Sequence, residues 1–249
     1  MPTRILGVIP ARFASSRFPG KPLASIAGKS MLQHVYERAS LARYLTEVVI
    51  ATDDQRIYDE ARRFGAPVRK TRSDHASGTD RVAEVAAGNP AEIVVNIQGD
   101  EPLIEPAAID AAIVGILDDP HIPMATLKKR IENAEEIRNP NVVKVVTDRS
   151  ENAIYFSRRA IPFVRSPEAG GAPYYKHVGL YVYRRTFLLG YSELPVGPLE
   201  LAERLEQLRA LENGYKIRVI ETDYDSLGVD TIEDLQRVSR LFELNRVGV

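Results

Sequence analysis

The stretch RILGVIPARFASSRFPGKPL, residues 4–23, joins an apolar run to a loop that carries three cationic side chains. The apolar run has the length and composition of a buried strand. The loop after it holds Arg12, Arg17 and Lys21 among Ala, Ser, Pro and Gly. Because ligands of open α/β sheets bind beyond the carboxyl ends of the strands, this loop is well placed to bind an anion. The stretch therefore predicts the first strand of an α/β sheet, followed by an anion-binding loop.

Apolar runs and amphipathic stretches alternate through the first half of the chain. The runs EVVIATD (47–53) and EIVVNIQGD (92–100) predict strands. The segment SMLQHVYERASLARY predicts a helix from about Met31 to Tyr44. This order is typical of right-handed βαβ units. We therefore expect an α/β fold with a mainly parallel sheet and helices on both faces.

The second half is richer in β-branched and aromatic residues, which favour added antiparallel strands. Three runs are of this kind: VVKVVTD (142–148), AIYFSR (153–158) and YYKHVGLYVYR (174–184). The segment 198–214, PLELAERLEQLRALENG, predicts one helix ended by Gly214, and Thr231 with Asp234 predicts the start of a terminal helix. No linker or repeat separates these parts. We expect one domain over residues 1–249, with a β-rich insertion at about 150–190.

Charge and composition exclude several classes of protein. The 249 residues include 33 basic and 34 acidic side chains, so the formal net charge is −1 and gives no overall attraction to nucleic acid or anionic membranes. There is no charged-then-apolar leader and no apolar run near the ~18 residues of a spanning helix. The chain has no cysteine, and its four histidines are scattered. We expect a cytoplasmic protein without membrane insertion or nucleic-acid partners, and Mg²⁺ as the metal if one is bound.

The anion-binding loop is not one of the two familiar phosphate-binding motifs. Gly28-Lys29-Ser30 resembles the end of a Walker A motif, but Leu23 stands where its first glycine should be, and no GxGxxG is present. Two guanidinium groups and one ammonium group nevertheless suit a polyphosphate. A solvated surface loop with unrelated cations is the open alternative.

Two carboxylates are candidate ligands of Mg²⁺. Asp100 follows an apolar strand at the predicted carboxyl edge of the sheet, and Asp230 stands at a turn before the terminal helix. In the alternative interpretation, Asp100 forms a turn and Asp230 belongs to a helix start. The spacing along the sequence does not bring the two residues together.

Eight segments in order give the chain a recognisable pattern. They are PARFASSRFPGKPL, TRSDHASGTDR, VNIQGDEPLI, NPNVVKVV, YFSRRAIPF, KHVGLYVYR, PLELAERLEQLRALENG and GVDTIEDL. With them the chain resembles the 3-deoxy-manno-octulosonate cytidylyltransferase family. The resemblance implies a nucleotide-diphosphosugar-transferase type of fold and a homodimer with a contact around 174–184. It also implies Mg²⁺-dependent transfer of CMP from CTP to the anomeric hydroxyl of 3-deoxy-D-manno-octulosonate (Kdo), for lipopolysaccharide biosynthesis.

The resemblance also implies roles for individual residues. The catalytic residues would be Arg12, Lys21 and Asp100, and the metal ligands Asp100 and Asp230. The nucleotide-binding residues would be Arg12, Ser15, Ser16, Arg17, Lys21, Arg72, Ser77, Gly78 and Arg81. The sugar-binding residues would be Gln98, Arg158, His177, Tyr181, Glu206 and Gln207. For His75 we expect a hydrogen bond that stabilises its loop.

Other interpretations stay open at this point. The same chemistry could act on the 8-amino derivative of Kdo or on another acidic sugar such as a sialic acid. The chain could also be a noncatalytic CTP-binding protein, or a glycosyltransferase, although the latter would need a different acidic motif. From spacing alone, Glu206 and Arg209 could be an exposed i,i+3 pair, and Tyr181 could only line the added sheet.

Overall fold

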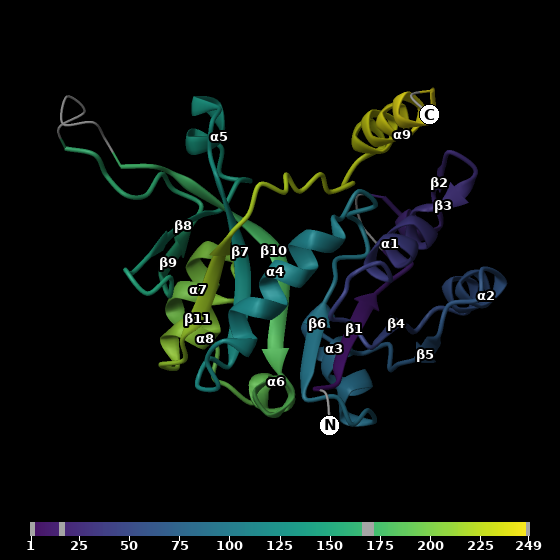
Figure 1. The fold of residues 1–249 in the computed structure, drawn as a ribbon, viewed down its shortest axis with the longest axis horizontal. Coiled ribbons are helices and arrows are strands. Elements are labelled where there is room, and N and C mark those ends of the chain that lie inside the picture. The colour runs from purple at the N-terminus through teal and green to yellow at the C-terminus, as the bar shows by residue number, and fades with distance from the viewer. Residues whose placement is uncertain (1–2, 15–17, 166–171, 248–249) are drawn as a thin grey trace. The chain divides into compact units, whose positions relative to one another are not determined.

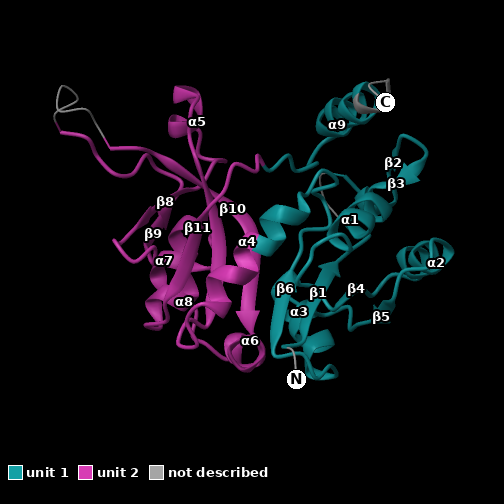
Figure 2. Cartoon of the chain, in the orientation of Figure 1, with its two compact units in different colours: residues 1–110, 226–249 teal, residues 111–225 magenta. Residues whose placement is uncertain are grey.

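The structure is a computed structural model, which describes residues 3–14, 18–165 and 172–247 (Figure 1). Its contacts divide the chain into two compact units (Figure 2). The first unit comprises residues 1–110 and 226–249, and the second comprises 111–225. The sequence-based expectation of one domain with an insertion at about 150–190 stays a prediction. Ser15, Ser16 and Arg17 lie outside the described residues.

The first unit is built on parallel strands. β1 (Ile5–Pro10) pairs with β4 (Glu47–Thr52) on one side and with β6 (Ile93–Asn96) on the other, and β5 (Val68–Lys70) extends the sheet beyond β4. Val8 stands opposite Val49 and Asn96 in this register. β1, β4 and β6 are almost wholly buried, which explains why they are continuous apolar runs.

Helices of the first unit follow its strands as the sequence predicts. α1 (Met31–Ala39), α2 (Gln55–Arg63) and α3 (Gly78–Ala87) alternate with the strands. α1 is shorter than predicted, because turns follow Ala39. The short elements η1 (Lys21–Leu23), β2 (Ser25–Ile26) and β3 (Lys29–Ser30) lie between β1 and α1. The anion-binding loop therefore leaves the carboxyl end of β1, as expected.

The C-terminal segment returns to the first unit. α9 (Ile232–Val247) begins at the predicted cap, where the Asp234 amide donates to Thr231 Oγ1 (3.2 Å) and the Thr231 amide donates to Asp234 Oδ2 (2.9 Å). Ile26, Met31, Val229 and Val238 form one buried apolar cluster. This cluster packs α9 and the segment before it against β2 and the first residue of α1.

The second unit carries the antiparallel strands that the composition predicts. β7 (Met124–Arg130) pairs antiparallel with β10 (Tyr175–Arg184) and parallel with β11 (Ile217–Glu221). β8 (Lys144–Thr147) pairs antiparallel with β10 and with β9 (Ala153–Ser157). Together with the first unit, these strands confirm the predicted class of a mainly parallel α/β fold with added antiparallel strands.

Five helices accompany the strands of the second unit in the described part of the chain. They are α4 (Pro106–Leu117), which starts in the first unit, α5 (Ala134–Arg138), α6 (Arg185–Tyr191), α7 (Pro198–Glu203) and α8 (Leu208–Glu212). The single helix predicted over 198–214 is wrong. Arg204 has a φ of 53°, and this left-handed residue ends α7 before α8 begins. Gly214, with a φ of 80°, follows α8 as predicted.

Two glycines on helices of the second unit differ in their surroundings. A Cβ atom on Gly115 of α4 would lie 2.6 Å from Cγ1 of Ile220, whereas a Cβ atom on Gly190 of α6 would meet nothing within 4 Å. We expect Gly115→Ala to lower the free energy of unfolding by about 1–2 kcal/mol, because the overpacking outweighs the gain in helix propensity. Urea unfolding measures this change. The control, Gly190→Ala, should unfold like the wild type or slightly later, and equal stability of both variants would contradict the close packing.

Candidate active site

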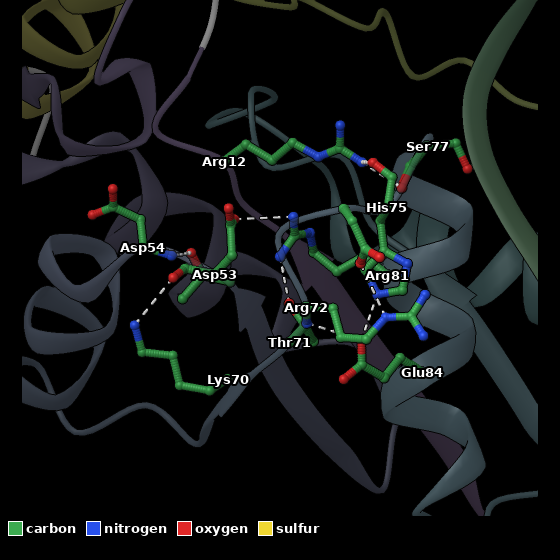
Figure 3. A network of polar contacts seen from close by, with 12 residues as sticks. Arg12, Asp53, Asp54, Lys70, Thr71, Arg72, His75, Ser77, Arg81 and Glu84 are labelled. Atoms are coloured by element: carbon green, nitrogen blue, oxygen red, sulfur yellow. Dashed lines mark hydrogen bonds and ion pairs between the residues drawn. The ribbon is translucent and has the colours of Figure 1, made fainter.

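Arg12 links the anion-binding loop to the segment before α3. Its Nη2 donates to the carbonyl oxygens of His75 (3.1 Å) and Ser77 (2.5 Å) (Figure 3). The two carbonyls lie on the predicted nucleotide segment 72–81. Arg12 therefore joins two parts of the sequence to which the resemblance assigns nucleotide binding, and the carbonyls fix the plane of its guanidinium group.

The Phe13 ring organises the same loop. The guanidinium carbon of Arg56 lies 3.2 Å from the centre of this ring, and the Gly20 amide donates to the Phe13 carbonyl at 2.9 Å. Gly20 has a φ of 73°, and a Cβ atom there would lie 3.0 Å from the ring. A glycine is thus required where the loop turns toward Lys21.

Lys21 lies between the two predicted metal ligands. Its Nζ donates to Oδ2 of Asp100 at 2.7 Å and to Oδ1 of Asp230 at 3.2 Å. The amide of Val229 donates to the carbonyl of Asp100 at 2.9 Å, which holds the segment of Asp230 beside the end of β6. Burial opposes the charge on Lys21, but the two carboxylates outweigh it and raise the pKa of the ammonium group. The structure therefore brings together three residues that the sequence separates widely.

A cavity of about 470 Å³ opens beside this cluster in the first unit. Arg12, Lys21, Gln98 and Asp100 contribute polar side chains to it. A Cβ atom on Gly99 would lie 3.0 Å from the Pro10 carbonyl, so the loop after β6 can approach β1 only with glycine there. The cavity has the size and the charges for a polyphosphate with its metal ion.

The segment 72–81 has both exposed and buried cations. Arg72 is exposed and pairs with Asp74 at 3.0 Å. Ser77 caps α3 through the amide of Asp80, and Gly78 lines the cavity. His75 bonds to Glu84, which agrees with the expected stabilising role of this histidine in its loop. Of the predicted nucleotide-binding residues in this segment, Gly78 is therefore the one that lines the cavity.

Arg81 is fully buried on α3. Its Nη2 lies 3.0 Å from Oδ1 of Asp53, and its Nη1 donates to Oγ1 of Thr71 (Figure 3). Burial lowers the pKa of Arg81 even though Asp53 favours the charge. In this structure Arg81 thus holds the ends of β4 and β5 together behind the loop, a contact that the sequence pattern does not reveal. Its predicted role in binding cytidine stays a prediction.

The predicted sugar-binding residues, except Gln98, belong to the second unit. The rings of His177 and Tyr181, both on β10, have centres 5.4 Å apart, and Phe156 meets His177 edge-on at 5.1 Å. Burial and the negative charge of Glu206 raise the pKa of Tyr181 well above its ordinary value. The Gln207 side chain is buried, and its Nε2 donates no hydrogen bond to a described residue. Such a buried amide group needs a partner, which a ligand can supply.

Arg158 is held by backbone carbonyls. Its Nε, Nη1 and Nη2 donate to the carbonyl oxygens of Glu203 (2.7 Å), Pro140 (3.0 Å) and Arg204 (3.4 Å). Each Nη nitrogen carries a second N–H, so the group can still bind a carboxylate. Arg209, which the spacing along the helix pairs with Glu206, makes a bidentate ion pair with Glu200 (2.6 and 2.8 Å).

Lys144 is a supporting residue that sequence reasoning missed. The side chain is wholly buried on β8, and its Nζ donates to the carbonyls of Asn139 (2.9 Å), Val142 (2.6 Å) and Arg158 (2.7 Å). Burial lowers its pKa. The only signal in the sequence was a lysine between valines in NPNVVKVV, where a strand buried on both faces would otherwise be apolar.

The described residues contain neither a cluster of metal-ligating side chains nor a helix that could span a membrane. No group of three or more His, Cys, Asp or Glu side chains in residues 3–14, 18–165 and 172–247 could hold a metal ion. Within the same ranges, no helix is long and apolar enough to span a bilayer.

Comparison with known proteins gives the class and then the family. A family model described as cytidylyltransferase matches residues 6–217, so the fold and site are those of a nucleotide-transferring enzyme class. A 3-deoxy-manno-octulosonate cytidylyltransferase of Solibacter usitatus is 70% identical, over 98% of this chain and 96% of the relative. That of Geobacter sulfurreducens is 57% identical, over 94% and 97%. The chain belongs to the 3-deoxy-manno-octulosonate cytidylyltransferase family, as the sequence motifs predicted.

A solved structure agrees with this assignment. The structure of a CMP:2-keto-3-deoxy-manno-octonic acid synthetase complexed with CTP has a TM-score of 0.94 and 46% sequence identity, over 98% of this chain and 100% of that one. A cytidylyltransferase of Leptospira borgpetersenii has a TM-score of 0.64 at 16% identity, which shows a shared fold alone.

The pKa of His177 predicts a pH-dependent stability. Burial lowers this pKa to about 3, against about 6.5 in the unfolded chain. The unfolded state therefore takes up a proton below about pH 6.5 that the folded state refuses, and stability falls as the pH drops. Between pH 7 and pH 5 the loss from this residue is about 2 kcal/mol. Urea unfolding of His177→Gln should lack this part of the loss.

The exposed His121 supplies the matched control for this measurement. His121→Gln removes one imidazole from an exposed position, so a difference between the two variants isolates the effect of position 177. Identical pH profiles of His177→Gln and the wild type would contradict the burial of a neutral imidazole at position 177.

Proposed function

We propose that this chain transfers CMP from CTP to the anomeric hydroxyl of Kdo, giving CMP-Kdo and pyrophosphate for lipopolysaccharide biosynthesis. The observation that carries the proposal is the cavity in which Arg12 and Lys21 lie beside Asp100, with Asp230 on the same ammonium group. The relatives that are named for this reaction match over nearly the whole chain.

The phosphate groups of CTP bind to the loop after β1. Arg12 suits two phosphate oxygens through its planar guanidinium group, and Lys21 adds a compact charge. These cations stabilise the negative charge that develops on the departing pyrophosphate. In-line displacement then depends chiefly on positioning, which the carbonyl contacts of Arg12 and the close turn at Gly20 provide.

The residues at the cavity also fit Mg²⁺. Asp100 and Asp230 offer hard oxygen donors near one point, since a single ammonium group reaches both of them. We propose that these two carboxylates hold the metal together with phosphate oxygens and water. When bound there, Mg²⁺ supplies charge neutralisation and a lower pKa for the attacking hydroxyl. Lys21 then has phosphate oxygens rather than the two carboxylates as partners.

The sugar acid is the part of the proposal that relies on the second unit. Arg158 suits the carboxylate of Kdo, whereas Gln207 has a buried amide group whose Nε2 can donate to a hydroxyl or another acceptor. His177, Tyr181 and Glu206, with Gln98 of the first unit, complete the proposed set of sugar-binding residues. The support for this set is the family resemblance and the buried polar groups of the second unit.

We further propose a cytoplasmic homodimer. Ile154 and Phe163 of the β-rich insertion are large apolar residues with 62% and 88% of their surface exposed, which suits an interface. The family resemblance supports a contact around residues 174–184. The exposed residues and the resemblance support the homodimer, and the composition of the sequence supports the cytoplasmic location.

Pyrophosphate release tests the function. Purified protein with CTP and Mg²⁺ should release pyrophosphate with Kdo and not without it. The 8-amino derivative of Kdo and a sialic acid are run beside it as competing substrates. If pyrophosphate release is faster with either of them, that sugar and not Kdo is the substrate. CTP binding without pyrophosphate release in the presence of any of the sugars would favour the noncatalytic interpretation.

The metal proposal predicts the behaviour of Asp100→Asn. This variant should fold normally, bind Mn²⁺ more weakly in the presence of CTP by electron paramagnetic resonance, and turn over roughly 100-fold or more slowly, because a metal ion supplies several kcal/mol to the transition state. Asp118→Asn changes the same charge at an exposed position and should behave as the wild type. Unchanged Mn²⁺ binding by Asp100→Asn would rule this carboxylate out as a ligand.

A further inference from the structure

An irregularity in the sheet of the second unit brings two predicted sugar-binding residues together. In the pairing of β7 with β10, Val178 stands opposite Leu127 and Val182 stands opposite Ala125. Residues 179–181 of β10 therefore face the single residue Thr126 of β7. Such bulges re-aim side chains and are frequent beside active sites. Here His177 stands just before the bulge and Tyr181 lies in it, with ring centres 5.4 Å apart.

Thr126 supplies the hydrogen bonds at this bulge. Its side chain is fully buried, and Oγ1 lies 2.8 Å from the carbonyl oxygen of Leu180, 3.1 Å from that of Val178 and 2.9 Å from Nε2 of His177. A hydroxyl group has one hydrogen to donate and two lone pairs that accept. The two carbonyl oxygens can only accept, so they compete for that single hydrogen.

This competition determines which nitrogen of His177 carries the proton. If Thr126 donated to Nε2, its oxygen would face both carbonyl oxygens at 2.8 and 3.1 Å without a hydrogen in between. If it donates to Leu180, its lone pair accepts from Nε2–H, and only the carbonyl oxygen of Val178, at 3.1 Å, faces it without a hydrogen of its own. A neutral imidazole protonated on Nε2 has an acceptor lone pair on Nδ1. No hydrogen bond from another described residue reaches Nδ1.

We propose that Thr126 is a positioning residue that fixes His177 as the Nε2–H tautomer, so that Nδ1 accepts a hydrogen bond from a hydroxyl group of the sugar substrate. The proposal rests on the proposed function for the identity of that substrate. It assigns His177 to a hydroxyl and excludes it as a partner of the sugar carboxylate, because a lone pair repels an anion.

The surroundings of His177 keep this arrangement in place. The ring packs between Phe156 and Tyr181, and burial lowers its pKa to about 3. The imidazole is therefore neutral at every pH at which the enzyme would work, so Nδ1 stays an acceptor and does not become a second donor.

Nitrogen-15 NMR of the histidine rings tests the tautomer without substrate. The full-length protein is labelled at its histidines, and His177→Gln identifies the signals of His177. We expect a protonated Nε2 and an unprotonated Nδ1 in the wild type. The opposite pattern, or equal amounts of the two tautomers, would overturn the proposal whatever the enzyme does with Kdo.

Two variants of Thr126 test the consequence for the substrate. Thr126→Val keeps the shape but removes the hydroxyl, so we expect mixed tautomers and a KM for Kdo that rises roughly threefold to tenfold, the value of one hydrogen bond, with the KM for CTP unchanged. Thr126→Ser retains the hydroxyl and should restore the wild-type tautomer and KM. Thermal unfolding shows which variants are folded.

The outcomes separate this proposal from the proposed function. A Thr126→Val protein with normal KM for Kdo would overturn the positioning role while leaving the cytidylyltransferase in place. If Thr126→Val does not fold, the wild-type tautomer and the behaviour of Thr126→Ser still decide the matter. A wild type that is inactive with Kdo would refute the proposed function, and the NMR result would stand independently of it.

Discussion

The first unit depends on one ammonium group that neutralises two carboxylates from distant parts of the sequence. The ammonium group of Lys21 lies 2.7 Å from the carboxylate of Asp100 and 3.2 Å from that of Asp230, and so offsets the repulsion between the two negative charges. These two ion pairs of Lys21 fix the point at which the loop after β1 meets the segment before α9. The apolar cluster of Ile26, Met31, Val229 and Val238 holds the same two segments together from behind. Charge and packing thus specify one arrangement.

Most strands could be predicted because their burial is visible in the sequence. β1, β4 and β6 are continuous apolar runs followed by turn residues, and the residues that bear chemistry stand just after them. The meeting of Asp100 with Asp230 could not be predicted from spacing, since it depends on the backbone bond from Val229 to Asp100. The break at Arg204 was also hidden, because the apolar stripe of 198–214 continues through it.

The residues that support the site were the hardest to find from sequence. Arg81, Lys144 and Thr126 are polar side chains in wholly buried positions, and each is stabilised by partners outside its own helix or strand. A sequence pattern treats a buried cation like an exposed one, because only the fold supplies its carbonyl or carboxylate partners. The eight sequence segments include Arg81 and Lys144 but not Thr126, and the burial of all three residues became visible only in the fold.

The order of the chain gives the first unit an unusual assembly history. Its strands come from residues before 110, yet Val229 and Asp230 follow the whole of the second unit in the sequence. A nascent chain that has emerged only as far as Asp225 already contains Arg12, Lys21 and Asp100 but not the second carboxylate. Because domains commonly fold during synthesis, such a chain can form these strands while one of the two carboxylates is still missing. The second carboxylate therefore reaches the first unit only after the whole of the second unit has been synthesised.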